Sequence, residues 1–391
     1  IVANASTNTY SLKDLFGNNI NSTNYTTYTS GGSTDEIYEI ATPYASADVF
    51  NLRFAQSADV MYFAHPSYAI RTLSRTDHNA WTFATPSINE NSTPVLTTSN
   101  NYPSVVTFFE QRLVFAATNN NPQTIWFSKN ADYLNFTTGT SADNALIYTI
   151  ASNQVNSIRY LSPTRVLTIG TSGGEYVLTT TNDGPITPTT TQIRKYSNYG
   201  SANIEPVQVA DVTLFLQRGN RKVREFKYVG EVNTAGYQAP DITVLAEHIT
   251  KGGVEGFAYQ QEPENIVWCI RADGTLLGLT YRREEAVVAW HKHVIGGKFG
   301  AGQAVVESIS ALPTDSGNDE LYMVVKRTIN GQTMRYVEVM KDFDFGSTTT
   351  SAFFVDSGLA YAGSAVSGFS SLYHLEGDDV SILANGASHP D

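Results

Sequence analysis

The sequence predicts an all-β protein built as a β-propeller-like array of about six blades, each about 50 residues long. Strand cores recur at a regular spacing, and most are followed by a turn and a second strand. The composition also favours strands and turns, because aromatic residues make up 12% of the chain and Thr, Ser, Asn and Gly recur throughout. Short strands repeating at this period are typical of propeller blades, which bury their faces against their neighbours.

Six strand cores define the repeat. They are VMYFAH from Val60, LVFAAT from Leu113, VLTIGT from Val166, TLFLQR from Thr213, IVWCIR from Ile266 and LYMVVK from Leu321, with starts 53, 53, 47, 53 and 55 residues apart. Alternation of side chains after the later cores, as in residues 276–281 and 334–339, favours strands over helices. Asp273-Gly274 and Asn330-Gly331 are strong hairpin signals. We therefore assign the propeller to residues 46–342.

The two ends of the chain fall outside the repeat. Residues 1–45 form a polar extension rich in Asn, Ser, Thr and Gly, and residues 343–391 are interpreted as the start of a further β module. The chain begins at Ile1 without the features of a signal peptide, so we expect it to start within a longer gene product. No apolar run approaches the ~18 residues of a transmembrane helix, which predicts no membrane span.

The charge balance argues against nucleic-acid binding. The chain carries 25 Lys and Arg against 37 Asp and Glu, a formal net charge of −12, whereas binding to DNA requires clustered cations. The segment RGNRKVREFK is the dense positive cluster, and it contains Arg218, Arg221, Lys222, Arg224 and Lys227. We predict a subunit contact there; a contact to DNA and a solvated hairpin are the alternatives. Strand alternation would place Lys222, Arg224 and Phe226 on one face, so the charges do not form one clean stripe.

Candidate catalytic and metal-binding residues are few. His291 and His293 would face the same side of a strand, but no third ligand lies at a characteristic spacing. The acidic pairs Glu284-Glu285 and Asp378-Asp379 would point apart in extended segments. Cys269 is the single cysteine and lies in an apolar run, as a buried side chain does. We assign no catalytic, cofactor-binding or metal-binding residue and expect a protein that is not an enzyme.

Four segments resemble the nozzle family of short-tailed bacteriophages, also called tail tubular protein B, and its prophage relatives. They are EIATPYASADVFNLRFAQSADVMYFAHPSYAIRTLSRT, QRLVFAATNNNPQTIWFS, LAEHITKGGVEGFAYQQEPENIVWCIRADGTLLGLTY and HLEGDDVSILANG. The resemblance covers roughly Glu39 to Asp391.

The resemblance implies a structural virion protein at the distal end of the tail. Such a subunit carries a β-propeller, assembles as a six-fold homo-oligomeric ring and contacts a tail adaptor ring and tail fibres or spikes. Its ring is a conduit through which the genome leaves without specific binding, and an acidic chain suits that role because a basic lumen would hold phosphates. The family usually has further residues before this start and after this end, so no gate residue is assigned.

Two other classes of function remain open. A carbohydrate-binding or glycan-hydrolysing propeller would use aromatic platforms such as Trp81, Trp126 and Trp290, with carboxylates that converge at the propeller centre. An intracellular interaction scaffold of the propeller type is the third hypothesis.

Overall fold

The computed structural model describes residues 2–3, 11–13, 18–21, 23, 38–91, 93–181, 184–230, 236–341, 355–361, 363–368, 372–384 and 387–389. The chain divides into two compact units, residues 1–41 and 42–391. In the first unit, β1 (Val2–Ala3) pairs antiparallel with β2 (Ser11–Leu12). The second unit contains the propeller. No helix in the described part of the chain combines the length and apolar character needed to cross a bilayer.

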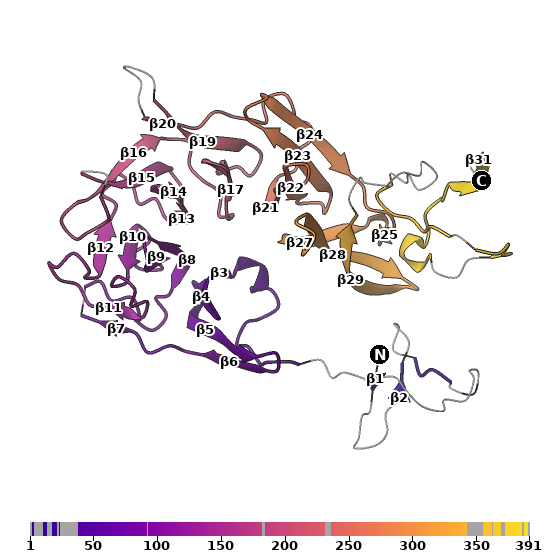
Figure 1. Ribbon diagram of the computed structural model, residues 1–391, viewed down its shortest axis with the longest axis horizontal. Helices are drawn as coiled ribbons and strands as arrows, with labels where there is room; N and C mark the ends of the chain where they lie inside the picture. The colour runs from indigo at the N-terminus through magenta and orange to yellow at the C-terminus, as the bar shows by residue number, and fades with distance from the viewer. Residues whose placement is uncertain are drawn as a thin grey trace. The chain divides into compact units, whose positions relative to one another are not determined.

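Six antiparallel sheets of the second unit form the blades, side by side around a central axis (Figure 1). The first three blades are β3 (Arg53–Ser57), β4 (Val60–His65), β5 (Tyr68–Asp77) and β6 (Ala80–Ala84); β8 (Pro103–Phe109), β9 (Arg112–Thr118), β10 (Thr124–Phe127) and β12 (Leu146–Thr149); and β13 (Ile158–Pro163), β14 (Leu167–Thr171), β15 (Gly174–Thr180) and β16 (Thr191–Ser197). The last three are β17 (Val207–Val209), β18 (Val212–Leu216), β19 (Val223–Val229) and β20 (Gly236–Gln238); β21 (Val254–Gln260), β22 (Ile266–Arg271), β23 (Leu276–Arg282) and β24 (Val287–His293); and the three-stranded β27 (Val305–Pro313), β28 (Asp319–Ile329) and β29 (Gln332–Met340). The prediction of a six-bladed all-β propeller is confirmed.

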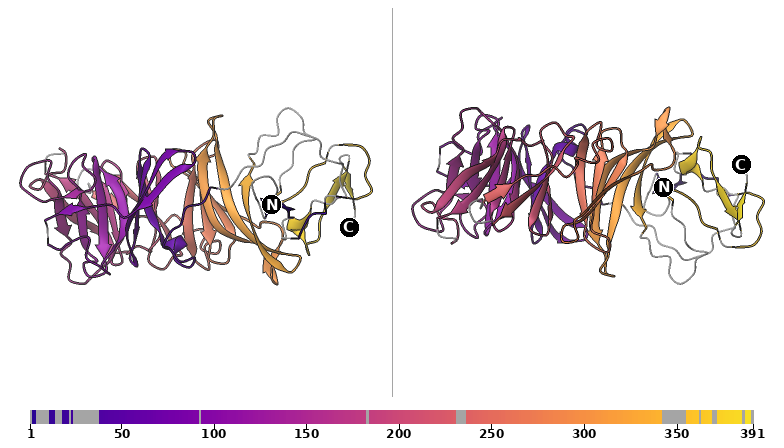
Figure 2. Two further views of the ribbon diagram at one scale, coloured as in Figure 1. Left: turned by 90° about the horizontal axis from the view of Figure 1, so that it is seen from below. Right: turned by 90° about the horizontal axis from the view of Figure 1, so that it is seen from above.

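Each predicted strand core lies in the second strand from the axis. The cores correspond to β4, β9, β14, β18, β22 and β28, and Figure 2 shows the strands running across the array from one of its faces to the other. These strands pair on both edges, and those of the second to fifth blades also pack on both faces, which is why they are the most apolar segments of their repeats. The hairpin signals are also confirmed: Asn330 and Gly331, both with positive φ, join β28 to β29, and Gly274, with φ of +82°, lies between β22 and β23.

Apolar clusters hold consecutive blades together. One cluster joins the first blade to the second, and four more join the second to the third, the third to the fourth, the fourth to the fifth and the fifth to the sixth. Trp126 and Trp268 are the largest side chains buried in these interfaces. Burial of this kind is the main favourable term in folding.

Small elements complete the second unit. They are the 3-10 helices η2 (Val49–Asn51) and η4 (Tyr373–Leu375), the parallel pair β7 (Asn89–Glu90) and β11 (Asn135–Phe136), and the antiparallel pairs β25 (Lys298–Phe299) with β26 (Gly302–Gln303) and β30 (Ile382–Ala384) with β31 (Ala387–His389). After the propeller, the chain returns to the connection between the fifth and sixth blades. There Gly296 donates its backbone N–H to Ser357 Oγ at 3.1 Å, and Gly297 donates to Asp378 Oδ2 at 2.5 Å. The residues after the sixth blade thus pack against the propeller.

Candidate functional site

The five cations predicted as a subunit contact lie on the β18–β19 hairpin of the fourth blade, but the structure separates them. Arg218 and Arg221 are exposed in the turn, Lys222 and Lys227 are half-buried, and Arg224 is buried. The turn therefore exposes Arg218 and Arg221 to solvent, whereas the strand buries Arg224. The proposed contact rests on the exposed pair, and its role as a subunit contact stays a prediction.

Arg224 is a structural residue of the fourth blade. Only 8% of it is exposed, Nε donates to Gln217 Oε1 at 2.8 Å and Nη1 to the carbonyl of Ala239 at 2.5 Å. Its guanidinium lies 3.4 Å from the centre of the Tyr199 ring. Reversal of Lys222 and Arg224 to Glu should therefore destabilise the monomer itself, because Arg224 has buried partners that an acidic side chain would lose.

Lys222 and Lys227 are paired within the same blade and its neighbouring loop. Lys222 Nζ lies 3.1 Å from Asp241 and 3.2 Å from Glu247, and hydrogen bonds to these carboxylates raise its pKa. Lys227 Nζ lies 3.1 Å from the buried Glu225. These two charges are largely satisfied inside the chain, which leaves little attraction for a partner.

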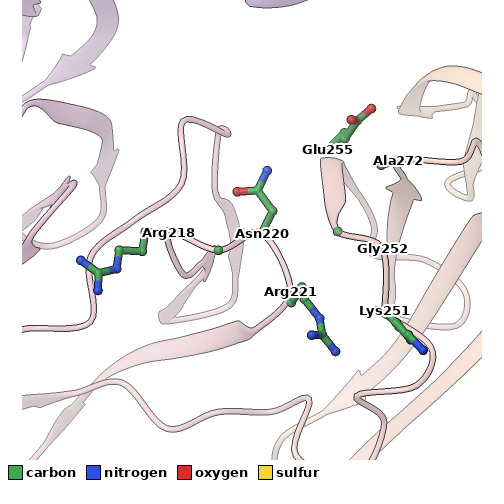
Figure 3. A pocket seen from close by; sticks show the side chains of 9 residues that line it. Arg218, Asn220, Arg221, Lys251, Gly252, Glu255 and Ala272 are labelled. Atoms are coloured by element: carbon green, nitrogen blue, oxygen red, sulfur yellow. The ribbon is translucent and has the colours of Figure 1, made fainter.

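A cationic hollow lies where the exposed arginines meet the fifth blade. Its volume is about 480 Å³, and it is lined by Arg218, Gly219, Asn220, Arg221, Lys251, Gly252, Gly253, Glu255 and Ala272. Figure 3 shows the side chains of Arg221 and Lys251 projecting the same way from its two walls, while Arg218 points away from both and Glu255 lies at the other end. Among the described side chains, no ion pair or hydrogen bond engages Arg218, Arg221 or Lys251. We call this feature the cationic hollow.

The cationic hollow can hold a negatively charged segment of another protein. Because the side chains of Arg218, Arg221 and Lys251 form no ion pair among the described residues, an acidic partner gains attraction there with little desolvation of existing pairs. The hollow is open and its cations are spread over two walls, which suits an extended segment better than one compact anion.

Sequence reasoning missed Lys251 because the turn that brings it to Arg221 is set by tertiary structure. Lys251 precedes two glycines with positive φ, Gly252 at +116° and Gly253 at +99°. The backbone N–H of Val254 then donates to the carbonyl of Asn220 at 2.7 Å, which joins the fifth blade to the β18–β19 turn. The KGG triplet was the available signal, because paired glycines mark a sharp change of chain direction.

A buried polar cluster next to Arg224 has a perturbed carboxyl group. Glu175 is fully buried and accepts hydrogen bonds from the hydroxyls of Ser197 and Ser201. Burial raises the pKa of Glu175, although the two hydroxyls and the charge of Arg224 oppose the rise. Beside it, burial and the charge of Glu175 raise the pKa of Tyr160. Both lie between the third and fourth blades.

This raised pKa predicts a pH-dependent loss of stability. The folded state binds the Glu175 proton more tightly than the unfolded state does, so stability falls as the pH rises from the ordinary value of 4.5 through the raised pKa. Glu175→Gln should remove this fall. We expect the free energy of unfolding in urea, measured at pH 4.5 and 7.5, to decrease more with pH in the natural chain than in the variant. Equal decreases in the two proteins would contradict the assignment.

The histidine pair does face one side, and a distant carboxylate joins it. His291 Nδ1 lies 2.9 Å from His293 Nε2, and His293 Nδ1 lies 2.5 Å from Asp356 Oδ1. Gly278, opposite His291 on β23, leaves room for the imidazole ring. Within the described ranges, no group of His, Cys, Asp and Glu has the arrangement of a metal site. The trio instead ties the segment after the sixth blade to the fifth blade.

A second hollow of about 530 Å³ lies at the propeller axis, lined by Phe50, Arg53, Ile204, Glu205, residues 255–257, 270–272, Gly274, residues 305–309 and Lys326. Arg53 of the first blade crosses it, because Nη2 donates to the carbonyl of Asn203 at 3.0 Å and Nη1 lies 3.7 Å from Glu205. Residues 203–205 precede the fourth blade. The axis is therefore bridged by side chains from opposite blades. We call this feature the axial hollow.

The tryptophans considered as sugar platforms are held inside the fold. Trp126 is fully buried, and its Nε1 donates to the carbonyl of Pro94 at 3.0 Å, so it cannot stack on a glycan in this structure. Trp290 packs on an apolar core and donates to the carbonyl of Ile242 at 3.0 Å. Trp81 is half-buried against Arg75. The idea of Trp126 as a platform is wrong, because the residue completes the interface between the first two blades.

Comparison with known proteins adds a likeness of fold. No protein-family model matches the chain, and no curated protein matches it. Among solved structures, Hsv2 of Kluyveromyces lactis is similar with a TM-score of 0.44 and 6% identity, covering 77% of this chain and 75% of that one. Hsv2 of Kluyveromyces marxianus has a TM-score of 0.38 and 9% identity over 71% of this chain and 72% of that one. Neither likeness bears on function.

Proposed function

We propose that the chain is a nozzle subunit of a short, non-contractile phage tail, a structural virion protein rather than an enzyme. The observation that carries the proposal is the sequence resemblance, and the position of one resembling segment adds support. Residues 245–281 supply Lys251, Gly252, Gly253, Glu255 and Ala272, the wall of the cationic hollow that faces the β18–β19 turn. A segment typical of the family thus builds a surface suited to an acidic protein partner.

The conduit in this proposal is the space enclosed by a ring of subunits, about six in number. A single propeller does not supply it, because the axial hollow has the size of a small-molecule pocket, within about 300–1,000 Å³, and Arg53 crosses it. Acidic surface on the subunits would let DNA pass without being held. The cationic hollow would then face a neighbouring subunit, the adaptor ring or a fibre, and not the DNA.

The location of the protein in virions tests the proposal directly. Immunogold electron microscopy, with antibody raised against residues 46–340, should place gold at the distal tail of particles from the source culture. Particles without label, together with antigen in the soluble fraction, would overturn the virion assignment. Co-purification with host proteins in the absence of particles would favour the intracellular scaffold.

The cationic hollow makes a prediction about assembly. Arg221→Glu with Lys251→Glu should weaken binding of the acidic partner, subunit or adaptor, by at least tenfold, roughly 1.4 kcal/mol, because two attractions become repulsions. The monomer should stay folded, since both side chains are exposed. Assembly is measured by sedimentation of the purified chain alone and with adaptor protein.

A charge-matched control tells whether the effect comes from this surface or only from the change in net charge. Arg282→Glu with Lys292→Glu changes two exposed cations of the fifth blade by the same amount and should leave assembly unchanged. If the two double variants assemble alike, the cationic hollow is not the contact.

One observation favours the alternative of a glycan-hydrolysing propeller. Glu205, Glu255 and Glu307 all line the axial hollow, and their environments differ. Hydrogen bonds from Arg335 and Lys326 lower the pKa of Glu307, whereas Glu205 is exposed and lies 3.7 Å from Arg53. Two carboxyl groups in different environments that line one hollow are what glycoside hydrolysis requires. Turnover of a polysaccharide that Glu205→Gln abolishes would establish this function in place of the structural one.

A further inference from the structure

The six blades of the propeller have five apolar interfaces between them. Every pair of blades that is consecutive in the chain shares a buried cluster, from the first and second blades to the fifth and sixth. No such cluster among the described residues joins the sixth blade to the first. Figure 1 shows these two blades as neighbours around the axis, so their facing surfaces, which we call the seam, are the interface that the array lacks.

The first blade presents an apolar face to the seam. Tyr62 and Ala64 of β4 point to the second blade, so the alternate residue Phe63 points the other way. Phe63 pairs across strands with Phe54 of β3 and with Arg71 of β5. Phe54 is 54% exposed, an unusual position for a phenylalanine in a blade.

The sixth blade presents a matching face. Leu321, Met323 and Val325 of β28 point to the fifth blade, which leaves Val324 on the side of the seam. Val337 of β29 pairs with Val324 and is 73% exposed. Each side of the seam thus has exposed apolar side chains, and on the sixth blade these lie beside the ion pairs of Glu307 with Lys326 and Arg335.

The two faces are already close at their inner ends. Phe50 and Arg53 of the first blade line the axial hollow together with Glu307 and Lys326 of the sixth blade. The five intact interfaces hold the first and sixth blades in one chain, so their faces are present to each other at a high effective concentration. A second molecule would have to bind more strongly than this intramolecular contact to replace it.

One polar group on the first blade's face is unsatisfied. The Nε of Arg71 is buried and finds no hydrogen-bond partner in the described structure. An unsatisfied buried donor gains most from an acceptor, so a surface that packs on this face has to supply one.

We propose that the sixth blade packs on the first blade of the same chain and closes the propeller at the seam. Closure buries Phe54 against Val324 and Val337 and covers the side of the axial hollow. Because the other five interfaces have buried clusters in the open form and the seam does not, the seam is the weakest of the six and the place where the propeller opens first. The proposal is independent of the nozzle function.

Cross-linking of paired cysteines tests closure in the complete chain. The native Cys269 is fully buried, and burial raises the pKa of its thiol, so it does not compete with exposed cysteines. Phe54→Cys with Val337→Cys, treated with a short flexible bis-maleimide at low protein concentration, should give an intramolecular link that changes the gel mobility of the monomer. Val155→Cys with Val337→Cys is the matched control, since Val155 is 75% exposed but lies between the second and third blades. It should stay unlinked.

Other products of the same reaction would overturn the proposal. Covalent dimers would show that a second copy covers the faces, and equal linking in both pairs would show that the reagent does not report the seam. Absence of any link would show that the faces stay apart or that another occupant separates them.

A second measurement does not depend on the geometry of the link. The thiol of Val337→Cys should react with a soluble maleimide about tenfold more slowly than that of Val155→Cys, because closure protects it. Phe54→Asp, which places a charge in the closed seam, should restore the fast rate. Equal rates in the two single-cysteine chains would overturn closure even if the cross-link fails to form for chemical reasons.

Discussion

Arg224→Glu is expected to destabilise the monomer by about 3–5 kcal/mol. The guanidinium is buried, bonded to Gln217 and to the carbonyl of Ala239, and stacked on Tyr199. An acidic side chain would leave these acceptors without a donor. It would also place a second negative charge near the buried Glu175, whose pKa is raised by burial and partly lowered again by the charge of Arg224. Against a typical stability of about 5–15 kcal/mol, this loss is large. The midpoint of urea unfolding, followed by tryptophan fluorescence, measures it.

Arg221→Glu is the control on the same hairpin. Arg221 is exposed and makes no described ion pair, so the same change of charge should alter the free energy of unfolding by no more than about 0.5 kcal/mol. If the two variants unfold at the same urea concentration, Arg224 is not the buried anchor that the structure describes. A fall in the unfolding slope as well as the midpoint would indicate that the variant's unfolding is no longer two-state.

The sequence predicted the fold because the signals for a blade are local. The six apolar cores recur at a near-constant spacing, and each core proved to be the strand with neighbours on both edges. The Asn330-Gly331 turn followed from backbone chemistry alone, since both residues adopt positive φ with little strain. Periodicity and turn residues act within one blade, so they can be interpreted without knowing how the blades pack.

The candidate site was predicted less well because it depends on contacts between blades. Strand alternation separated Arg224 from Glu225, yet both are buried, since each face of a blade packs on a neighbour. No local pattern links Lys251 to Arg221, or Asp356 to His293 across 63 residues of chain. The carboxylates of the axial hollow were anticipated only as a general possibility. Their identity depends on which residues begin the inner strands.

Gly274→Ala should destabilise the protein by about 3 kcal/mol, through two additive causes. Gly274 has a φ of +82°, which an L-residue adopts only with strain. A Cβ atom there would also lie 2.7 Å from Cα of Val305, at the junction of the fifth and sixth blades. The contact is with backbone, so no side-chain rotation relieves it. The backbone N–H of Val306 donates to the carbonyl of Gly274 at 2.9 Å, and a shift would weaken that bond as well.

Gly331→Ala is the control that carries the backbone strain without the steric contact. Gly331 has a similar φ of +72°, but nothing lies within 4 Å of the position where its Cβ would be. It should therefore cost only the backbone strain, about 1–2 kcal/mol. The difference between the two variants in urea unfolding then reports how tightly the β22–β23 turn packs on β27. Equal losses would mean that this junction yields to an added methyl group.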